Sequence, residues 1–363
     1  MALNFAQWGN DLYTGRRSYQ IVAHRSRWFT AVGALAIIAL AILLSRGFNL
    51  GIDFRGGSEF TVSGVQDTSQ GPAITAVQSI SPDEVPRVSV VGQNAIRVQT
   101  SEFTNTEDVQ RVRDALAGAY GVDPGEVTTA FIGPTWGAGV SQRALWGTVV
   151  FVLVVAVFMA LYFRAWRMSL AAIIAMLGDI LIAAGVYAAV GWEVTPSTII
   201  GFLTILGYSL YDKVVVFDKV RENTAGVLDQ SRSTYAERAN LAVNQTLVRS
   251  VNTGVVAILP VAGILFVGAF LLGAGTLRDI SLSLFVGIAA GTASSIFLAT
   301  PLEVSLRERE PRIAKHTAKV IASRQAAAAS GEDVAVHATA AAGSQLMPGQ
   351  HRGQQAQPRR KGR

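Results

Sequence analysis

The 363-residue chain has few charged residues. Only 15% of the residues are charged, whereas soluble domains contain about a quarter, and this shortage indicates a membrane protein. Cysteine is absent, which excludes disulfides, thiolate metal sites and cysteine nucleophiles. The four histidines lie outside the long apolar segments, which excludes a histidine relay inside a membrane; they are His24, His316, His337 and His351.

The sequence also lacks the signatures of an enzyme. It contains no glycine-rich phosphate loop. Its polar segments show no nucleophile–base pair and no cluster of metal-ligand residues at a known spacing. We therefore expect no enzymatic activity, no metal and no organic cofactor.

The chain contains long apolar segments. Half of its residues are hydrophobic, and the mean hydropathy is +0.36. Because a helix needs about 20 apolar residues to cross a bilayer, we predict an α-helical integral membrane protein with six transmembrane helices. The first apolar run offers no signal-peptide cleavage site and is expected to be a retained anchor. The six predicted spans are 28–44, 144–163, 168–190, 197–217, 250–272 and 280–302.

Positive charges gather on one side of the predicted membrane, in segments 1–27, 218–249 and 303–363. Cytoplasmic loops carry this excess, so both termini are expected in the cytoplasm. The same rule accounts for much of the pI of about 9.8, and no nucleic-acid partner is predicted. The tail 303–363 is expected to be largely disordered. Its basic end, 358–363, is interpreted as solvated rather than as a contact to RNA or anionic lipid.

Residues 45–143, between the first two predicted helices, form a domain on the opposite side, outside the cytoplasm. Their pattern has the order βαββαβ of a ferredoxin-like fold, which defines no activity by itself. The predicted strands are 57–62, 87–91, 95–100 and 126–132, and the predicted helices are 72–80 and 106–119.

An aspartate lies inside the fourth apolar run. Asp212 precedes the polar Asp218 by about 9 Å, at about 1.5 Å per helical residue. A charge at this depth costs several kcal/mol and usually faces a protein interior or a wet cavity. We predict a proton-relay role, with Tyr208 and Ser209 as hydrogen-bond partners one turn earlier. The alternative is a snorkelling residue or a structural salt bridge.

Three further charged residues are relay candidates. Asp179 is the deepest acid of the third run, and Lys213 directly follows Asp212. Adjacent helical residues point about 100° apart, so Lys213 is not expected to face the partner of Asp212. An Asp179–Lys213 ion pair and a relay role remain equally open. Arg249, just before the fifth run, is either a partner of a carboxylate or a positive anchor, and spacing alone favours the anchor.

Four motifs occur in an order that resembles one known family. GIDFRGG at 51–57 resembles GIDFTGG, and ILGYSLYDKVVVFDKVREN at 205–223 resembles the fourth-helix motif ILGYSLNDTVVVFDRIREN. Residues 244–250 and 276–302 match the fifth and sixth helices. Together they resemble the SecF side of the SecD/SecF family of bacterial protein export, over roughly residues 25–305. Spacing alone predicts only a tight turn for the first motif, whose residues include Gly51, Asp53, Phe54, Gly56 and Gly57.

The resemblance implies membership of the RND superfamily of proton-driven transporters. It implies that SecF and SecD together use the proton motive force to move polypeptide across the bacterial plasma membrane. The implied partners are SecD, the SecYEG translocon, the unfolded polypeptide and the lipid bilayer. Protons would be the coupling ion, and no other cofactor is implied.

The resemblance also assigns residues. Asp212 matches the family's fourth-helix carboxylate, and Arg249 matches its fifth-helix arginine, which makes Arg249 a relay candidate after all. The chain departs from the family at Tyr211, which replaces Asn, at Lys213, which replaces a small hydroxyl residue, and at Gly178, which replaces His. An added cation and a lost histidine predict a proton path that differs in detail.

Two alternative functions stay open. A proton-coupled exporter of lipids or small molecules would have a substrate cavity and usually both halves in one chain. A non-transporting scaffold of the translocon would tolerate the loss of both Asp212 and Arg249.

Overall fold

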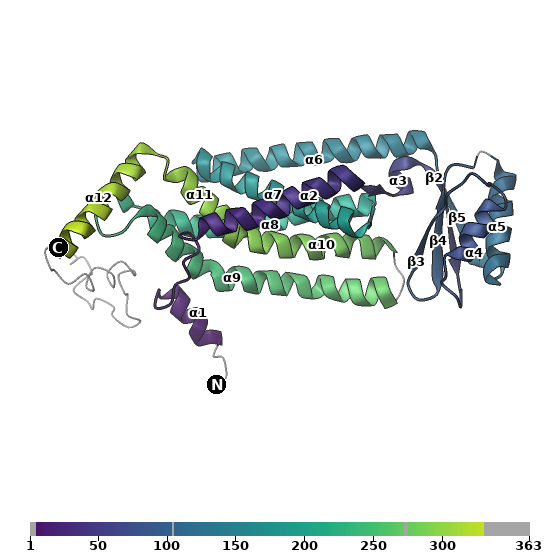
Figure 1. The fold of residues 1–363 in the computed structure, drawn as a ribbon, viewed down its shortest axis with the longest axis horizontal. Helices are drawn as coiled ribbons and strands as arrows, with labels where there is room; N and C mark the ends of the chain where they lie inside the picture. The colour runs from purple at the N-terminus through teal and green to yellow at the C-terminus, as the bar shows by residue number, and fades with distance from the viewer. Residues whose placement is uncertain (1–4, 104, 272–274, 330–363) are drawn as a thin grey trace, which may run out of the picture. The chain divides into compact units, whose positions relative to one another are not determined.

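The computed structural model describes residues 5–103, 105–271 and 275–329. Figure 1 labels the helices and strands of the fold. The chain divides into two compact units. The first contains Arg25–Val215 and Arg249–Glu303, and the second contains Met1–His24, Val216–Val248 and Val304–Arg363.

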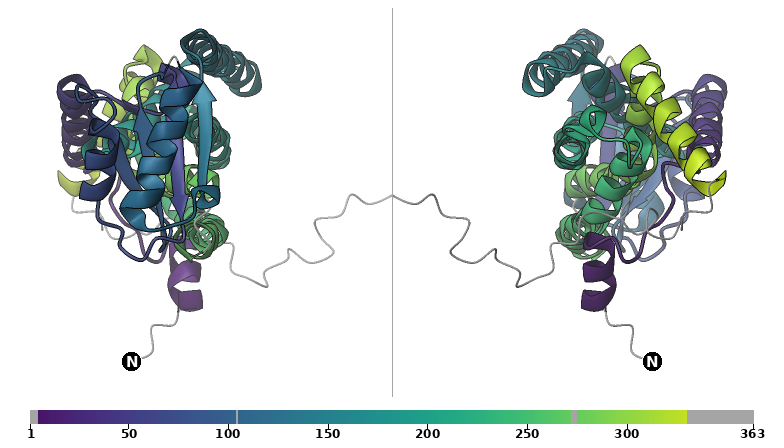
Figure 2. Two further views of the ribbon diagram at one scale, coloured as in Figure 1. Left: turned by 90° about the vertical axis from the view of Figure 1, so that its right-hand side faces the viewer. Right: turned by 90° about the vertical axis from the view of Figure 1, so that its left-hand side faces the viewer.

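A four-stranded antiparallel sheet forms part of the first unit, with the strand order β3-β4-β2-β5. Two helices pack on one face of this sheet domain, and they lie in front of the sheet in the left view of Figure 2. This is the predicted ferredoxin-like arrangement, since the two central strands are the first and the third of the βαββαβ order. Its elements are β2 (Gly57–Ser63), α4 (Gly71–Gln78), β3 (Arg87–Val91), β4 (Ala95–Thr100), α5 (Thr106–Tyr120), η1 (Pro124–Glu126) and β5 (Val127–Ile132).

Alternation of apolar residues explains the core of the sheet domain. Phe60 and Val62 on β2 and Ile96 and Val98 on β4 are completely buried. Successive strand residues point to opposite faces, so these four side chains share the face that α4 and α5 cover. On α5, Val112, at helical spacing from Leu116, is buried against them.

Six helices are long and apolar enough to cross a membrane within the described residues. The predicted fold class is confirmed. Large apolar side chains such as Leu145, Leu153 and Leu161 are exposed along one helix, as expected for contact with lipid. The helical elements are α2 (Arg25–Arg46), α6 (Pro134–Phe163), α7 (Trp166–Val190), α8 (Pro196–Thr224), α9 (Tyr235–Gly263) with η3 (Ile264–Leu271), and α10 (Gly275–Ser294) with η4 (Ser295–Ala299) and α11 (Thr300–Arg307).

Several helices extend beyond the apolar runs. α6 begins ten residues before the expected start at 144, at Pro134. The expected loop 218–249 is mostly helical, because α8 ends at Thr224, η2 spans Val227–Asp229 and α9 begins at Tyr235. Hydropathy reports the length in contact with lipid, whereas a helix with one apolar stripe can continue into water.

The second unit is held by polar contacts. Oδ1 of Asn244 on α9 accepts from the backbone N–H of Tyr19 at 2.7 Å, and its Nδ2 donates to the Tyr19 carbonyl at 2.9 Å. The unit also contains α1 (Phe5–Tyr13) and α12 (Pro311–Ala329). The first part of the tail is helical as far as Ala329, because Ile313 and Val320 give α12 a buried apolar side. Residues 330–363, and residue 272 at the end of the predicted fifth span, lie outside the described residues.

A short connector joins α2 to the sheet domain. It contains β1 (Asn49–Leu50), which pairs in parallel with β6 (Glu193–Val194), and α3 (Ile52–Arg55). Gly57 follows with φ +136°, and a Cβ there would lie 2.4 Å from the carbonyl oxygen of Thr100. The GIDFRGG motif therefore forms a single helical turn whose glycines allow close backbone contact.

Candidate functional site among the buried charges

Two side chains of opposite charge meet inside the helix bundle. Asp179 lies on α7 and Lys213 on α8, and both side chains are completely buried. Nζ of Lys213 is 2.7 Å from Oδ2 of Asp179. Of the two alternatives left open by the sequence, the structure brings these residues together as an ion pair.

Hydroxyl groups complete this ion pair. Nζ of Lys213 also donates to Oγ of Ser209, one turn earlier on α8, and to Oγ of Ser294 on α10 at 3.0 Å. Ser209 Oγ in turn donates to Oδ2 of Asp179. The ammonium group thus uses all three of its protons. Because buried charges are costly unless paired and hydrogen-bonded, these contacts favour one relative arrangement of α7, α8 and α10.

Asp212 faces a different neighbour from Lys213, as the helical angle between adjacent residues predicts. It is 3% exposed, and its Oδ1 accepts a hydrogen bond from Oγ of Ser250 on α9, at 2.8 Å. Its Oδ2 is buried and accepts no hydrogen bond from any residue that the structure describes. The arrangement is a buried carboxyl group with one neutral hydrogen-bond donor.

Arg249 does not pair with Asp212 in the described part of the chain. Its side chain is exposed, and its guanidinium donates to the hydroxyl of Tyr211 at 3.2 Å. Tyr211 is itself 54% exposed. Two adjacent contacts therefore connect α8 to α9: Tyr211 to Arg249 on the exposed side, and Asp212 to Ser250 on the buried side.

The predicted supporting residues are placed differently from the expectation. Ser209 donates to Asp179 rather than to Asp212, and the buried hydroxyl of Tyr208 has no hydrogen-bond partner among the described residues. Tyr208 lies four positions and Ser209 three positions before Asp212 on α8. The packing of α8 against α7 and α10 decides which carboxylate such a hydroxyl group can reach. The relay roles of these residues stay predictions.

Sequence reasoning missed Ser250 and Ser294. Ser294 lies in a run of small residues on α10 that begins at Gly287, a pattern that by itself predicts only close packing of helices. Ser250 was hidden by its charged neighbour Arg249. The available signal for Ser250 was its position directly after the relay candidate Arg249. Within the described residues, no group of three or more histidine or acidic side chains could hold a metal ion.

The residues of the GIDFRGG motif lie away from these buried charges. Phe54 packs in an apolar cluster with Tyr187 and Phe202. Burial, followed by repulsion from Glu59 and Glu193, raises the pKa of Asp53, and Arg97 opposes this shift. The motif is therefore part of a structural connection with its own charged surroundings.

Comparison with known proteins gives one consistent family. Residues 112–309 match the family "Protein export membrane protein SecD/SecF, C-terminal", and residues 41–67 match the "SecD/SecF GG Motif". The chain is 44% identical to the protein translocase subunit SecF of Streptomyces coelicolor, covering 89% of this chain and 86% of that protein. It is 41% identical to the protein translocase subunit SecF of Mycobacterium tuberculosis, covering 89% of this chain and 74% of that protein.

A solved structure has a similar fold. The crystal structure of SecDF, a translocon-associated membrane protein from Thermus thermophilus, superposes with a TM-score of 0.70 at 28% identity. The match covers 81% of this chain and 39% of that chain, so this chain spans about two fifths of the SecDF protein. A second structure of SecDF, in a super-membrane-facing form, gives a TM-score of 0.58.

Proposed function

The chain belongs to the SecD/SecF family of protein-export membrane proteins, and from this premise we propose that it couples the proton motive force to polypeptide translocation. It is a multi-pass membrane subunit of the Sec export system. In the proposal it acts with SecD beside the SecYEG translocon in the bacterial plasma membrane, with both termini in the cytoplasm. The coupling ion is the proton, and the protein is not an enzyme.

The single observation that carries the proposal is the environment of Asp212. Among the described residues, the carboxyl group of Asp212 has one hydroxyl donor and no paired cation, and in the proposal it exists in a neutral or a charged form. The two forms require different surroundings, because a buried charge is stable only with an opposite charge or several donors. Binding and release of one proton would therefore change the preferred packing of α8 against α9.

Arg249 supplies the second arrangement in this proposal. It occupies the position before Ser250 on α9, and a turn of α9 by about 100° exchanges one residue for the next opposite Asp212. We infer that neutral Asp212 pairs with Ser250, whereas ionised Asp212 attracts the guanidinium of Arg249. Such switching needs two packings of similar stability, which a single charge change can bias.

The membrane potential supplies enough free energy for this cycle. Each elementary charge that crosses the membrane carries about 2.3 kcal/mol per 100 mV. A few protons per cycle are sufficient to drive the repacking of helices and the movement of a small domain attached to them.

The test is to replace Asp212 by Asn, which keeps size and polarity but cannot ionise. The variant is measured with SecD in inverted membrane vesicles, for both polypeptide export and proton uptake. We expect the part of export that depends on the proton motive force to be lost, while the variant still assembles. The matched control is Asp218→Asn, the same change at an exposed position further along α8. Full proton-dependent export in Asp212→Asn overturns the proposal.

A further inference from the structure

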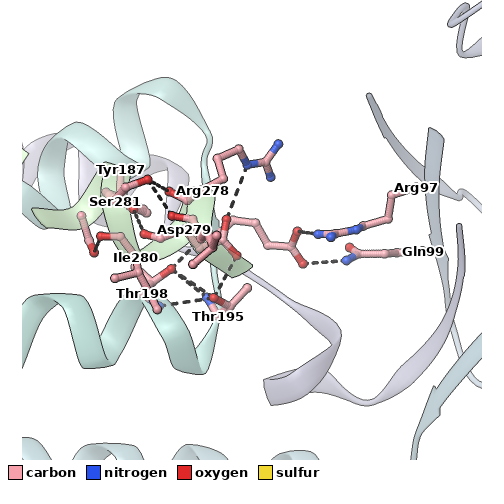
Figure 3. A network of polar contacts seen from close by, with 12 residues as sticks. Arg97, Gln99, Tyr187, Thr195, Thr198, Arg278, Asp279, Ile280 and Ser281 are labelled. Carbon is pink, nitrogen blue, oxygen red and sulfur yellow. Dashed lines mark hydrogen bonds and ion pairs between the residues drawn. The ribbon is translucent and has the colours of Figure 1, made fainter. Parts of the chain in front are cut away.

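A polar network connects the sheet domain to the helices (Figure 3). Its central residue is Glu193, in the two-residue strand β6 that follows α7. Oε1 of Glu193 accepts a hydrogen bond from Nε2 of Gln99 at 2.6 Å, and Oε2 lies 3.6 Å from a guanidinium nitrogen of Arg97. Because Arg97 and Gln99 are both on β4, a single carboxylate of the helix bundle binds two side chains of the sheet.

The same two sheet residues also bind an acid of their own domain. Glu59 on β2 accepts from Nε2 of Gln99 at 3.0 Å and lies 3.4 Å from Nε of Arg97. These four residues, Glu59, Arg97, Gln99 and Glu193, are called here the junction network. The side chains of its charged members are only 12–20% exposed, so water screens them weakly.

Negative charge exceeds positive charge in the junction network. It contains two carboxylates and one guanidinium, and a third acid, Asp53, is close enough for Glu59 and Glu193 to raise its pKa. Arg97 contacts two of these acids, Glu59 and Glu193, and Arg55 adds a second positive charge that interacts with Glu193. The junction network holds the sheet domain in place although its acids outnumber its cations. The net attraction across the network is therefore expected to change when the domain is displaced slightly.

Contacts beyond Glu193 tie the junction network to the membrane helices. The carbonyl of Glu193 accepts from Oγ1 of Thr198 on α8 at 3.4 Å. Thr195, which precedes α8, donates through Oγ1 to Oδ2 of Asp279 on α10 at 3.1 Å. The hydroxyl of Tyr187 on α7 donates to the carbonyl of Asp279 at 3.1 Å. Figure 3 shows Arg97 and Gln99 on one side of this network and Thr195, Thr198 and Asp279 on the other.

Helices α8 and α10 are in close contact between this network and the buried charges. A Cβ on Gly201 of α8 would lie 1.8 Å from Oγ of Ser283, and a Cβ on Gly287 of α10 would lie 2.1 Å from Cδ1 of Ile205. Further along, Gly291 of α10 packs on Ser209, where an added Cβ would be 3.1 Å from the serine Cβ. Such small-residue contacts let backbones approach, so neither helix shifts without the other.

We propose that Glu193 is a positioning residue that passes a change in charge at Asp212 from the paired helices α8 and α10 to the sheet domain. The start of α8 contacts Glu193 of the junction network through Thr198, and the start of α10 contacts the neighbouring Thr195 through Asp279. The buried charge cluster includes Lys213, further along α8, and Ser294, at the end of α10. The inference rests on the proposed role of Asp212. The simpler alternative is that Glu193 only clamps the domain, whatever the state of Asp212.

The chain contains no cysteine, so spin labels attach only to two cysteines that are introduced for the test. The positions are Gln110 on α5 and Val190 at the end of α7, which are both exposed. The full chain, assembled with a cysteine-free SecD in lipid vesicles, is compared in four forms: unchanged, Asp212→Asn, Glu193→Ala, and both together. The measurement is the distribution of distances between the two labels.

With Glu193 present, Asp212→Asn is expected to shift the main distance. With Glu193→Ala, the distribution is expected to broaden, and Asp212→Asn is expected to cause no further shift. Glu193→Gln keeps an oxygen for Gln99 but loses the charge facing Arg97, so a reduced shift is expected; this variant decides if the alanine variant fails to assemble. Glu126→Ala removes an exposed acid of the sheet domain; it is the control and should keep the full shift.

A shift of equal size with and without Glu193 overturns the inference, and so does no shift in either background. The two proposals fail separately. If Asp212→Asn stops proton-dependent export but moves no label, the role of Glu193 falls while that of Asp212 stands. If that variant exports normally, the role of Asp212 falls first, and the role of Glu193 with it.

Discussion

Lys213 and Asp212 are consecutive residues of α8, yet their side chains lie in different environments on two sides of that helix. On the side of α7 and α10, Lys213 has an opposite charge and two hydroxyl groups within hydrogen-bond distance. On the side of α9, Asp212 has one hydroxyl donor and an oxygen without a partner among the described residues. Each carboxylate thus has one oxygen without a partner among the described residues, but only Asp179 faces an opposite charge. The difference separates a charge that is neutralised by its neighbour from one that is not, and in the proposed function only the second responds to a proton.

The largest effect is expected from Lys213→Met, which leaves Asp179 as a buried charge without an opposite charge beside it. Removing one member of a buried ion pair typically costs about 3–5 kcal/mol. The measurement is the midpoint of thermal unfolding in detergent. In the double variant Asp179→Asn, Lys213→Met no charge remains, and most of the stability is expected to return. If the single and double variants are equally stable, the pair contributes no such constraint and the contrast between the two sides of α8 is wrong.

Glycine substitutions test the packing of the same helix. Gly287→Ala on α10 places a methyl group against Ile205, and overpacking of this kind costs about 1–3 kcal/mol. Gly207→Ala is the matched change on the open side of α8, where an added Cβ meets no atom within 4 Å. Alanine is the better helix former, so this control is expected to be slightly stabilising. Equal unfolding midpoints for the two variants would contradict the close contact of α8 with α10.

Ser250→Ala removes the one hydrogen bond of Asp212, and the expected loss is about 1 kcal/mol. Its control is Ser281→Ala on α10, where the hydroxyl donates only to carbonyls of its own helix. Denaturant titrations of both variants give the comparison. A smaller loss for Ser250→Ala than for its control would mean that the contact between α8 and α9 contributes nothing.

The smallest effect concerns an acid outside the membrane segments. Burial and repulsion from Glu59 and Glu193 raise the pKa of Asp53 above its ordinary value of 3.8, so the folded protein binds this proton more tightly than the unfolded chain. Ionised Asp53 therefore lowers stability above the raised pKa, and this penalty disappears below the unfolded value. Asp53→Asn should be more stable than the unchanged protein near pH 7 and lose its advantage towards pH 4. If the difference in stability between Asp53→Asn and the unchanged protein stayed constant from pH 7 to pH 4, the prediction would be refuted.

Much of the architecture was predictable because the underlying patterns are local. Alternating residues on β2 and β4 and helical spacing on α5 gave the ferredoxin-like domain, and apolar length gave the six spans. Helix ends were not predictable from hydropathy, because residues 218–224 and 235–249 are polar but helical. The helix α12 was missed because a few buried residues, Ile313 and Val320 among them, are a weak signal within an alanine-rich segment.

Charged residues inside apolar runs could be read from the sequence, but their partners could not. The angle between adjacent helical residues correctly implied that Lys213 and Asp212 face different neighbours. Which neighbours these are depends on how α7, α9 and α10 pack, which sequence spacing does not contain. Ser209 was therefore assigned to the wrong carboxylate, and Arg249 was expected opposite Asp212, where Ser250 lies.

The three hydrogen bonds of Lys213 also restrict how α8 can move. Turning α8 about its long axis would separate Lys213 from Asp179 and Ser294 together, and would leave two unlike charges unsatisfied in a dry interior. Turning α9 would separate Asp212 from Ser250 and Tyr211 from Arg249. It would also break contacts of the first half of α9, between Gln245 and Asn223 and between Asn244 and Tyr19. The three helices α7, α8 and α10 are therefore expected to move as one rigid body in any repacking that a proton on Asp212 triggers.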